Sequence, residues 1–442
     1  MRRPAPLVSF VPLALLALSP AISAQDLRQS IAEDYAAHLA DLFEHFHRNP
    51  ELSLAEHGTA ARMAEELRGA GFDVTEGVGG TGVVAVMENG DGPLVMMRAD
   101  MDGLPVEEKS GLPYASKAMQ EDPTTGEVVP VMHACGHDVH ITSLVGTARQ
   151  MAARRDAWQG TLMLVAQPAE ERGLGARAMR EDGIWDRFGQ PDFVLGFHVG
   201  AETAAGTVDV QEGPTYAGVD SVDIIVHGIG SHGASPHDGK DPIVLASQIV
   251  MALQTLVSRE LPPREPGVVT VGAFHSGTKH NIISDEARLQ LTVRNTNAES
   301  RDMLIAGIRR IAENMGRVAG LPEDLLPEVI VSNERTPPGF NDPELAQRLR
   351  AAWTAALGED RVVGRPQQGM AGEDFGYFAI DPEIPSVFWR VGGTPAADIE
   401  RAANGGPPIP SHHSPLFRIE PEPSVRVGVE STVAALLELM GR

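Results

Sequence analysis

Apolar residues recur along the chain with two distinct spacings, and these spacings predict where helices and strands form. Residues 28–48, 57–67 and 139–155 carry apolar side chains every three to four positions, which is typical of helices that bury one face. Between them stand shorter and more continuous apolar runs, which predict buried strands. These strands would lie at residues 82–87, 94–99, 161–166 and 193–198. Apolar strands that alternate with helices are typical of a mainly parallel sheet covered by helices on both faces.

The pattern changes after residue 213. A strand, a helix, two strands and a second helix follow within about 115 residues, an order that fits a small α+β domain with an open-faced sheet. These elements would lie at residues 221–227, 241–259, 268–274, 287–294 and 300–318. From residue 337 the first pattern returns and ends in a helix near residues 424–440. We therefore predict an α/β fold in which a discontinuous domain, with a mainly parallel mixed sheet flanked by helices, is interrupted by an inserted α+β satellite domain.

The expected boundaries are residues 25–214 and 333–442 for the discontinuous domain and 215–332 for the satellite domain. The first 24 residues stand outside both domains. Arg2 and Arg3 precede an apolar stretch and then small residues up to Ala24, an order typical of a cleaved secretory signal. The stretch is shorter than the roughly 20 apolar residues that a membrane-spanning helix needs. We therefore predict an exported protein, periplasmic or secreted, and leave the choice between the Sec and twin-arginine routes open.

Acidic residues outnumber basic ones, which limits the partners of this chain. The 442 residues include 36 lysines and arginines and 60 aspartates and glutamates, so that the formal net charge is -24 at pH 7. Such a surface repels nucleic-acid phosphates and anionic lipids unless a basic patch offsets it, and no run of lysine and arginine supplies one. We expect neither a nucleic acid nor, after signal cleavage, a membrane as partner. The single cysteine excludes an intrachain disulfide and a cysteine-rich zinc module.

That cysteine lies among histidines just before the predicted helix 139–155. One glycine separates Cys135 from His137 and lets the backbone turn tightly, so that a thiolate and an imidazole can converge on one metal ion. Two other interpretations stay open from the residues alone. Cys135 would be a nucleophile activated by a histidine, or a buried free cysteine beside a structural histidine cluster.

Two carboxylates follow the predicted strand 161–166. At a strand end the side chains of Glu170 and Glu171 diverge, so one can bind a cation while the other takes a proton from the attacking water. Taken alone, a Glu-Glu pair is more typical of an exposed helix start.

Three further histidines lie at strand ends or in loops. His198 ends the strand 193–198, and His412 and His413 follow a proline-rich loop. Taken singly, these would be a hydrogen-bonded core histidine and a surface loop. Together with the cysteine and the two glutamates they favour a metal site, because all would lie beside the same edge of the sheet.

The chain resembles the amidohydrolase branch of the aminoacylase/carboxypeptidase-G metallopeptidase family. That branch includes N-acyl amino acid amidohydrolases, hippurate hydrolases and auxin-conjugate hydrolases. The resemblance rests on four strings: His-Ala-Cys-Gly-His-Asp at 133–138, Gln-Pro-Ala-Glu-Glu at 167–171, Gly-Phe-His-Val at 196–199 and His-Ser-Pro at 413–415. Further matching strings stand at 228–237, 240–242, 277–281 and 372–375. The resemblance therefore extends over nearly all of the chain after residue 24, in order.

The resemblance also implies roles for individual residues and two divalent metal ions per subunit. The implied ligands are Cys135, His137, Glu171, His198 and His413. His413 is preferred to His412 because it directly precedes Ser-Pro. The metal best suited to sulfur, nitrogen and oxygen ligands is zinc, with manganese, cobalt or nickel as alternatives.

The other implied roles concern the proton and the substrate. Glu170 would be the general acid/base, and Asp100 would orient a ligand from behind. His232 of the satellite domain would reach the active site of a second subunit and polarise the scissile carbonyl, and Asn281 would hold the substrate carboxylate. The resemblance thus implies a homodimer through the satellite domain, with the discontinuous domain as the catalytic one.

One difference from other members of the family argues for the amidohydrolase branch and against the dipeptidase branch. Relatives outside the amidohydrolase branch carry His-x-Asp at the end of an early strand, where this chain has Arg98-Ala99-Asp100. We therefore predict hydrolysis of the amide bond of N-acyl amino acids to a carboxylic acid and a free amino acid. The alternatives are a metallo-dipeptidase or carboxypeptidase on small peptides, a cysteine amidase with Cys135 as nucleophile, and an inactive metal- or ligand-binding protein on the same scaffold.

Overall fold

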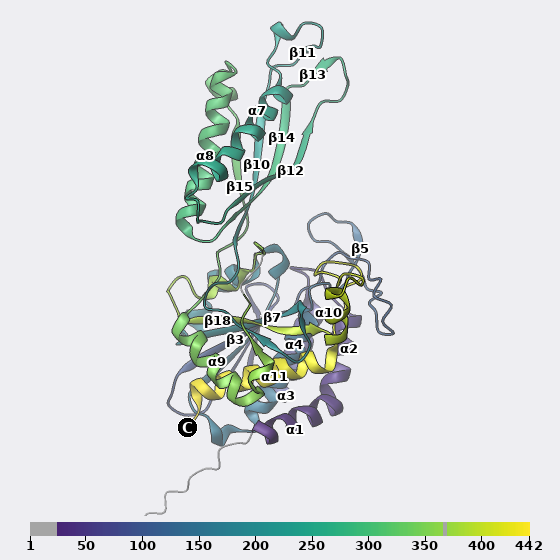
Figure 1. Ribbon diagram of the computed structural model, residues 1–442, viewed down its shortest axis with the longest axis vertical. Coiled ribbons are helices and arrows are strands. Elements are labelled where there is room, and N and C mark those ends of the chain that lie inside the picture. Colours follow the sequence, from purple (N-terminus) through teal and green to yellow (C-terminus); the bar gives the residue numbers. More distant parts are fainter. Residues whose placement is uncertain (1–23, 366–368) are drawn as a thin grey trace, which may run out of the picture.

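The computed structural model describes residues 24–365 and 369–442, whose helices and strands form two lobes (Figure 1). The larger lobe contains both ends of the described chain, and the smaller lobe is built from the middle of the sequence. Strands β10 (Gly218–His227) and β15 (Glu328–Thr336) of the smaller lobe lie next to the two crossings of the chain between the lobes. The predicted signal segment lies outside the described residues except for Ala24, with which the first helix begins.

The larger lobe is organised around a mixed sheet of eight strands in the order β1-β2-β6-β3-β7-β18-β8-β17. Its strands are β1 (Asp73–Val78), β2 (Gly82–Glu88), β3 (Leu94–Asp100), β6 (Thr161–Gln167), β7 (Phe193–Ala204), β8 (Val208–Asp209), β17 (Val362–Val363) and β18 (Ser386–Thr394). Strands β6, β3, β7 and β18 run parallel, and β1 and β2 continue the sheet antiparallel at one edge. The prediction of an α/β fold with a mainly parallel sheet is confirmed.

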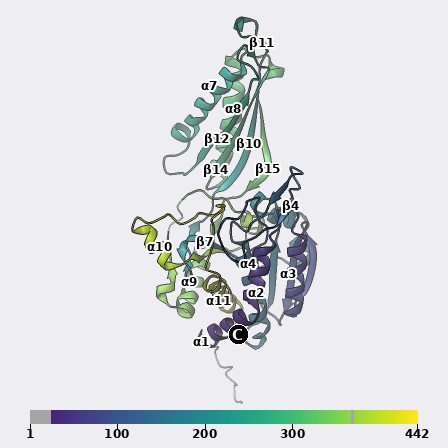
Figure 2. The same cartoon turned by 90° about the vertical axis from the view of Figure 1, so that its right-hand side faces the viewer.

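Helices cover both faces of this sheet, which explains the continuous apolar runs. In β3, Val95 and Met97 pack into the hydrophobic cluster on one face, and Met96 packs into the cluster on the other. The first face carries α1 (Ala24–Asp34), α2 (Ala40–Arg48), α3 (His57–Gly69), α4 (His137–Ala152), α9 (Pro343–Leu357) and α11 (Pro421–Met440) (Figure 2). The second face carries α5 (Gly175–Glu181), α6 (Ile184–Phe188) and the 3₁₀ turn η8 (Asp374–Phe378).

The smaller lobe is an antiparallel sheet in the order β12-β14-β10-β15, packed against two helices. Its other elements are β12 (Val268–Ser276), β14 (Glu286–Asn295), α7 (Pro242–Thr255) and α8 (Ala298–Val318). Residues of β10 are alternately buried and partly exposed, as expected for a sheet with one covered face. The predicted open-faced α+β arrangement is present. Strand β15 was not predicted, and the expected boundary between residues 332 and 333 falls inside it, so the domain limits stay a prediction.

Short elements complete the two lobes. They are β4 (Met119–Glu121), β5 (Val128–Pro130), β9 (Gly213–Pro214), β11 (Ser231–His232), β13 (Ile282–Ile283), β16 (Phe340–Asn341) and α10 (Ala396–Ala403). Strands β11 and β13 pair at the end of the smaller lobe that lies farthest from the larger lobe (Figure 1). We call this end the tip.

Candidate active site

The candidate site lies where the parallel strands of the larger lobe end. Strands β3, β6 and β7 point their carboxyl ends to the same edge of the sheet, and α4 begins beside them. In an open α/β sheet this edge is where ligands bind. Asp100 and Gln167 are the last residues of β3 and β6. His198 was expected to end its strand, but it lies in the middle of β7, which continues to Ala204.

The turn before α4 brings Cys135 and His137 together. Gly136 between them adopts a left-handed conformation with φ 87°, and a Cβ atom there would stand 2.3 Å from Cγ1 of Val199. Only glycine fits this turn without displacing the strand. Nδ1 of His137 donates to the backbone carbonyl of Asp102 at 2.9 Å, which leaves Nε2 with its lone pair.

A strained turn after β6 contains the two glutamates Glu170 and Glu171. Ala169, just before them, has φ 49°, a left-handed conformation that is unfavourable for alanine. The buried carboxylate of Glu56 accepts the backbone N–H of Ala169 at 2.8 Å, and the Asp102 carboxylate accepts that of Glu171 at 3.0 Å. Two buried acids therefore hold the Glu170-Glu171 turn in place.

The predicted ligands meet in space although they are far apart in sequence. Three groups of side chains each place one ligand atom per residue within 4.8 Å of one another. The groups are Cys135, Glu171 and His413; Cys135, His198 and His412; and His137, Glu170 and Glu171. Because they share Cys135 and Glu171, they form one continuous cluster, which we call the ligand cluster. It contains Glu170 and all five predicted ligands.

The hydrogen bonds of the two neighbouring histidines favour His413 over His412 as a ligand. Nε2 of His412 accepts the backbone N–H of Ala201 at 3.1 Å, so its proton resides on Nδ1, the atom that faces Cys135 Sγ at 3.7 Å. Nε2 of His413 instead lies 3.4 Å from a carboxylate oxygen of Glu171. His413 also has φ 65°, a conformation uncommon outside glycine that is often found at functional sites.

Unpartnered buried atoms show that the cluster fits a cation. Nε2 of His137 and Oε1 of Glu171 are buried and have no hydrogen-bond partner among the described residues. Buried polar atoms without partners are costly, and a bound divalent ion would satisfy both. The thiol, imidazole and carboxylate donors are those that bind zinc and related transition metals.

The acidic groups of the cluster also favour the binding of a cation, because their pKa values are raised in its absence. Burial and the neighbouring carboxylates of Glu373 and Glu171 raise the pKa of Glu170 well above its usual value. Burial, opposed by His137, raises the pKa of Glu171 to about 8. Burial and then the charges of Glu171 and Glu170 raise the pKa of the Cys135 thiol well above its usual value. A divalent ion among these groups would reverse the shifts by stabilising their charged forms.

The thiol is thus disfavoured as a nucleophile. A cysteine nucleophile needs a lowered pKa and partial exposure, whereas Cys135 is 8% exposed and its pKa is raised. This argues against the cysteine amidase interpretation.

Behind the cluster, Asp100 and Arg98 form a buried network that the sequence predicted only in part. Oδ2 of Asp100 accepts from Arg98 at 2.7 Å and its Oδ1 accepts from Nδ1 of His140. Burial works to raise the pKa of Asp100, but Arg98, His137 and His140 outweigh it, and the pKa lies well below its usual value. Asp100 therefore stays charged, and its Oδ2 lies 3.7 Å from Nε2 of His137, the atom that would bind a metal. The role of Asp100 in orienting a ligand stays a prediction.

Sequence reasoning missed several members of this network. Arg98 also pairs with Glu373 at 2.8 Å and Asp374 at 3.2 Å, which are the N-cap and the first residue of the turn η8. His140 lies one helical turn after His137, and its Nε2 accepts the backbone N–H of Val199 at 2.8 Å, so it has no lone pair left for a metal. The spacing of the two histidines on α4 was the available signal for His140, and the matched string at 372–375 was the signal for Glu373 and Asp374.

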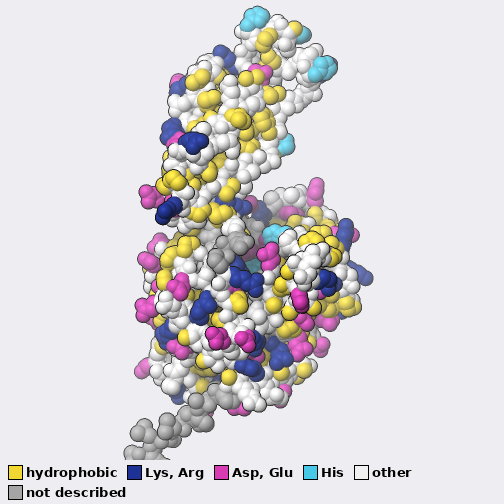
Figure 3. Space-filling model, in the orientation of Figure 1, with side chains coloured by type: hydrophobic (Ala, Val, Ile, Leu, Met, Phe, Trp, Pro, Cys, Tyr) yellow, Lys and Arg dark blue, Asp and Glu magenta, His cyan; other side chains and the backbone are white. Residues whose placement is uncertain are grey.

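The structure does not bring His232 and Asn281 to the ligand cluster of the same chain. Both are exposed residues at the tip, in the other lobe (Figures 1 and 2). There Nδ1 of His232 accepts the backbone N–H of Ala234 at 3.0 Å, and the backbone carbonyl of Asn281 accepts that of Gly233 at 2.9 Å. Histidine side chains stand out on the tip surface in Figure 3.

Comparison with known proteins places this geometry in a family. The sequence pattern of peptidase family M20/M25/M40 matches residues 96–404, more than half of the chain. The chain is 36% identical over 352 residues to N-acetyl-L-cysteine deacetylase of Bacillus subtilis, with 79% of each protein covered. It is also 36% identical over 333 residues to hippurate hydrolase of Campylobacter jejuni, with 75% of this chain and 82% of that protein covered.

A solved structure shows the same arrangement. A dinuclear metal-binding peptidase of the M20 family from Bacillus subtilis superimposes with a TM-score of 0.73 at 28% identity, with 93% of this chain and 99% of that chain covered.

The relatives correct the predicted location. The deacetylase and the hippurate hydrolase are cytoplasmic enzymes, which contradicts the prediction of an exported, periplasmic or secreted protein. That prediction rested on the order of basic, apolar and small residues in the segment 1–24 alone. Such an order is a pattern of composition alone, and the segment lies outside the described residues except for Ala24.

The two lobes, the buried cluster of metal-binding side chains and the sequence relatives agree with one another. The resemblance drawn from the short strings is confirmed. The chain belongs to peptidase family M20/M25/M40 and is a metal-dependent hydrolase of that family.

Proposed function

We propose that this hydrolase cleaves the amide bond of N-acyl amino acids and releases a carboxylic acid and a free amino acid. The observation that carries the proposal is the ligand cluster, in which buried atoms of His137 and Glu171 lack partners beside a free thiol. Two relatives, a deacetylase of N-acetyl-L-cysteine and a hippurate hydrolase, are named for this reaction class. Peptide hydrolysis is the second candidate, since a relative 35% identical over 350 residues is named a thermostable carboxypeptidase.

Two divalent ions would be held by the five predicted ligands, and the likeness to a dinuclear metal-binding peptidase supports this number. These ligands are Cys135, His137, Glu171, His198 and His413. Bound there, the ions would supply Lewis-acid activation of water and of the scissile carbonyl. Nδ1 of His198 donates to the carbonyl of Val199 at 2.7 Å, so its Nε2 is free to bind, 3.4 Å from Cys135 Sγ. The mixed donor set favours zinc over manganese, cobalt and nickel.

Glu170 would move the proton. It belongs to the ligand cluster through His137 and Glu171, and it also adjoins the acids Glu373 and Asp374. Its carboxylate would accept the proton of the attacking water and then return it to the nitrogen of the leaving amino acid. Bound ions would counter the raised pKa of Glu170 and keep its carboxylate charged for the first step, and the proton that it gains there is the one that it returns in the second.

His232 and Asn281 would act across a homodimer. Both stand on the tip, away from the cluster of their own chain, so their predicted roles require a second copy of the chain. The smaller lobe exposes apolar side chains suited to such contact, among them Val244 and Met251 of α7 and Ile282 of β13. His232 of one chain would then polarise the scissile carbonyl in the cluster of the other, and Asn281 would hold the substrate carboxylate.

A substrate panel with metal removal tests the proposal. We expect the metal-loaded protein to hydrolyse acetyl, benzoyl, long-chain acyl or indolyl-acetyl amino acids, and to lose this activity after chelation and regain it with zinc. Dipeptides in the same panel test the second candidate. Full activity after complete removal of metal would contradict the mechanism, and metal binding without turnover of any panel member would indicate an inactive scaffold.

A further inference from the structure

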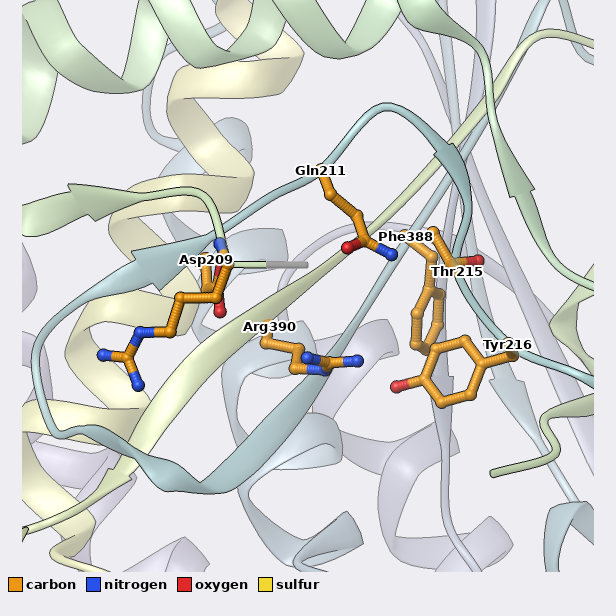
Figure 4. A pocket seen from close by; sticks show the side chains of 7 residues that line it. Asp209, Gln211, Thr215, Tyr216, Phe388 and Arg390 are labelled. Atoms are coloured by element: carbon orange, nitrogen blue, oxygen red, sulfur yellow. The ribbon is translucent and has the colours of Figure 1, made fainter. Parts of the chain in front are cut away.

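A pocket lies at the point where β18 and the segment that leads to the smaller lobe meet (Figure 4). Its enclosed space is only about 10 Å³, and the rest of the hollow is open to solvent. Its lining includes Gln211, Thr215, Tyr216, Arg365, Phe388 and Arg390. Two of these six side chains are guanidinium groups.

The register of three strands fixes the place of this pocket. Arg390 of β18 pairs with His198 of β7 on one side and with Asp209 of β8 on the other. Directly paired residues point their side chains to the same face of a sheet, so these three form a row. The pocket therefore opens beside His198, a member of the ligand cluster.

Arg390 is a partly buried guanidinium that faces a phenol instead of an acid. Its guanidinium carbon lies 5.8 Å from the centroid of the Tyr216 ring, and Figure 4 shows the two groups pointing toward one another. No carboxylate of the described residues lies within 4.0 Å of it. Asp209, its strand neighbour, accepts the backbone N–H of Arg365 at 2.9 Å.

Other arginines in comparable surroundings are matched by acids. The buried Arg98 pairs with Asp100, Glu373 and Asp374, and the partly buried Arg301 binds Asp220 through two nitrogen atoms. Taking a guanidinium out of water without an anion is unfavourable. An arginine left without one, in a pocket beside a catalytic cluster, is available to the carboxylate of a ligand.

A second guanidinium stands at the outer part of the same pocket. Arg365 is exposed, and its side chain donates to the backbone carbonyl of Glu202 at 3.1 Å. It forms no ion pair with any described residue. With Asp209 as the one acid of the lining, the pocket carries an excess of positive charge in a protein whose formal net charge is -24.

We propose that Arg390 and Tyr216, with Arg365 at the rim, bind a second carboxylate of the substrate, in addition to the α-carboxylate of the amino acid. The preferred substrates are then N-acyl amino acids with an acidic side chain, or amino acids acylated by a dicarboxylic acid. Both carry the same group to the pocket, from opposite sides of the scissile amide. This inference rests on the proposed function.

A binding experiment tests the pocket without turnover. Glutarate and the monocarboxylate butyrate are titrated calorimetrically into the metal-loaded protein and into Arg390→Gln, Arg390→Lys and Arg348→Gln. Arg348 is an exposed residue of α9 that pairs with Glu438, and its variant is the matched control. We expect Arg390→Gln to weaken the binding of glutarate about tenfold relative to butyrate, Arg390→Lys to weaken it less, and the control to leave it unchanged.

A kinetic experiment identifies the end of the substrate that carries the acid. The first pair of substrates is N-acetyl-glutamate and N-acetyl-glutamine, and the second pair is N-succinyl-alanine and N-butanoyl-alanine. In one pair, wild-type protein should favour the acidic member by about tenfold or more in kcat/KM, and Arg390→Gln should bring that ratio toward one. The pair that responds shows whether the carboxylate comes from the amino acid or from the acyl group.

The two experiments separate the failure of this inference from that of the proposed function. Equal use of acidic and neutral members by wild-type protein, or a ratio that Arg390→Gln leaves unchanged, overturns the inference while the amidohydrolase function stands. If none of the four compounds is hydrolysed, the proposed function fails for these substrates, and the glutarate titration alone decides whether the pocket binds a carboxylate. Equal glutarate affinity in wild type and Arg390→Gln would then overturn it.

Discussion

The ligand cluster and the tip of the smaller lobe contain the two sets of residues to which we assign catalytic roles. The two regions differ in burial and in the hydrogen bonds that hold their side chains. The cluster is buried, and its histidines His137 and His198 are each oriented by a hydrogen bond from the other ring nitrogen. The tip is exposed and short: β11 and β13 have two residues each, and His232 accepts a hydrogen bond from within its own loop.

This contrast between a buried cluster and an exposed tip indicates which groups one chain can position by itself and which groups a second chain can supply. Metal ligands need fixed positions, and the cluster fixes them with strained turns at Ala169 and His413 and with buried acids behind them. A group that contacts the substrate can instead be supplied by a second surface when two chains meet. The cluster should therefore tolerate little change, whereas changes at the tip should affect turnover and leave the metal in place.

The largest effect is expected for Glu170→Gln. Replacing the proton-transferring carboxylate should lower kcat/KM on a good N-acyl amino acid by about 10³-fold or more, because general acid–base catalysis is worth about 10²–10⁴-fold and this group serves two steps. Metal content and the melting temperature should stay near those of wild type. Glu181→Gln, an exposed residue at the end of α5, is the matched control. Activity within a few-fold of wild type would show that another group moves the proton.

The next largest effect should come from the tip. His232→Ala should lower kcat by about 10²-fold, the order expected for loss of one group that stabilises the oxyanion, while metal content stays unchanged. His237→Ala, an exposed histidine of the same lobe, is the control.

Mixing two inactive variants sharpens this test. If His232 acts on the other chain, re-formed heterodimers of His232→Ala and Glu170→Gln contain one complete site, and an equal mixture should recover about a quarter of wild-type activity. If the activity of the mixture stays at background level, His232 acts within its own chain or has no part in the reaction.

The smallest effect is expected on the stability of the fold, from the buried His47, which binds a residue next to the predicted ligand His137. His47 is buried and binds Asp138 at 2.6 Å and Glu108 at 3.1 Å. Burial works to lower its pKa, but these two acids raise it to about 9. Since the unfolded value is about 6.5, the protonated form stabilises the folded state fully below pH 6.5, and this contribution is lost as the pH rises through 9.

We expect this contribution to be on the order of 2–3 kcal/mol, from the shift in pKa. Urea unfolding of metal-loaded protein between pH 6.5 and 9 should show a free energy of unfolding that falls with pH. In His47→Gln that fall should be smaller. Parallel profiles for the two proteins would exclude His47 as the source.

The sequence was sufficient to predict those elements whose pattern of apolar and polar side chains reflects their burial. Strand β3 is buried on both faces, and its continuous apolar run predicted it. Strand β15 has one buried residue, Val329, among exposed and partly exposed ones such as Ile330 and Glu334, and gave no such signal. Similarly, Cys135 and His137 are neighbours in sequence, and the glycine between them indicated that both side chains can converge on one metal ion.

The rest of the site depends on contacts that no local pattern encodes. Arg98 meets Glu373 only because η8 folds back over β3, 275 positions later in the chain. His412 and His413 both lie in the cluster, and only the backbone N–H of Ala201, which occupies Nε2 of His412, favours His413 as the ligand. The separation of the tip from the cluster depends on the packing of the two lobes. These are properties of tertiary structure, which motif spacing does not reveal.

The most direct test of the central claim is the metal content of the reconstituted protein, measured by elemental analysis after removal of free metal. Wild-type protein should hold two divalent ions per chain, and Glu171→Ala, which removes the carboxylate shared by two groups of the cluster, should hold one or none while remaining folded. A wild-type protein that binds no metal, or a Glu171→Ala, Cys135→Ala double variant that still holds two ions, would contradict the account.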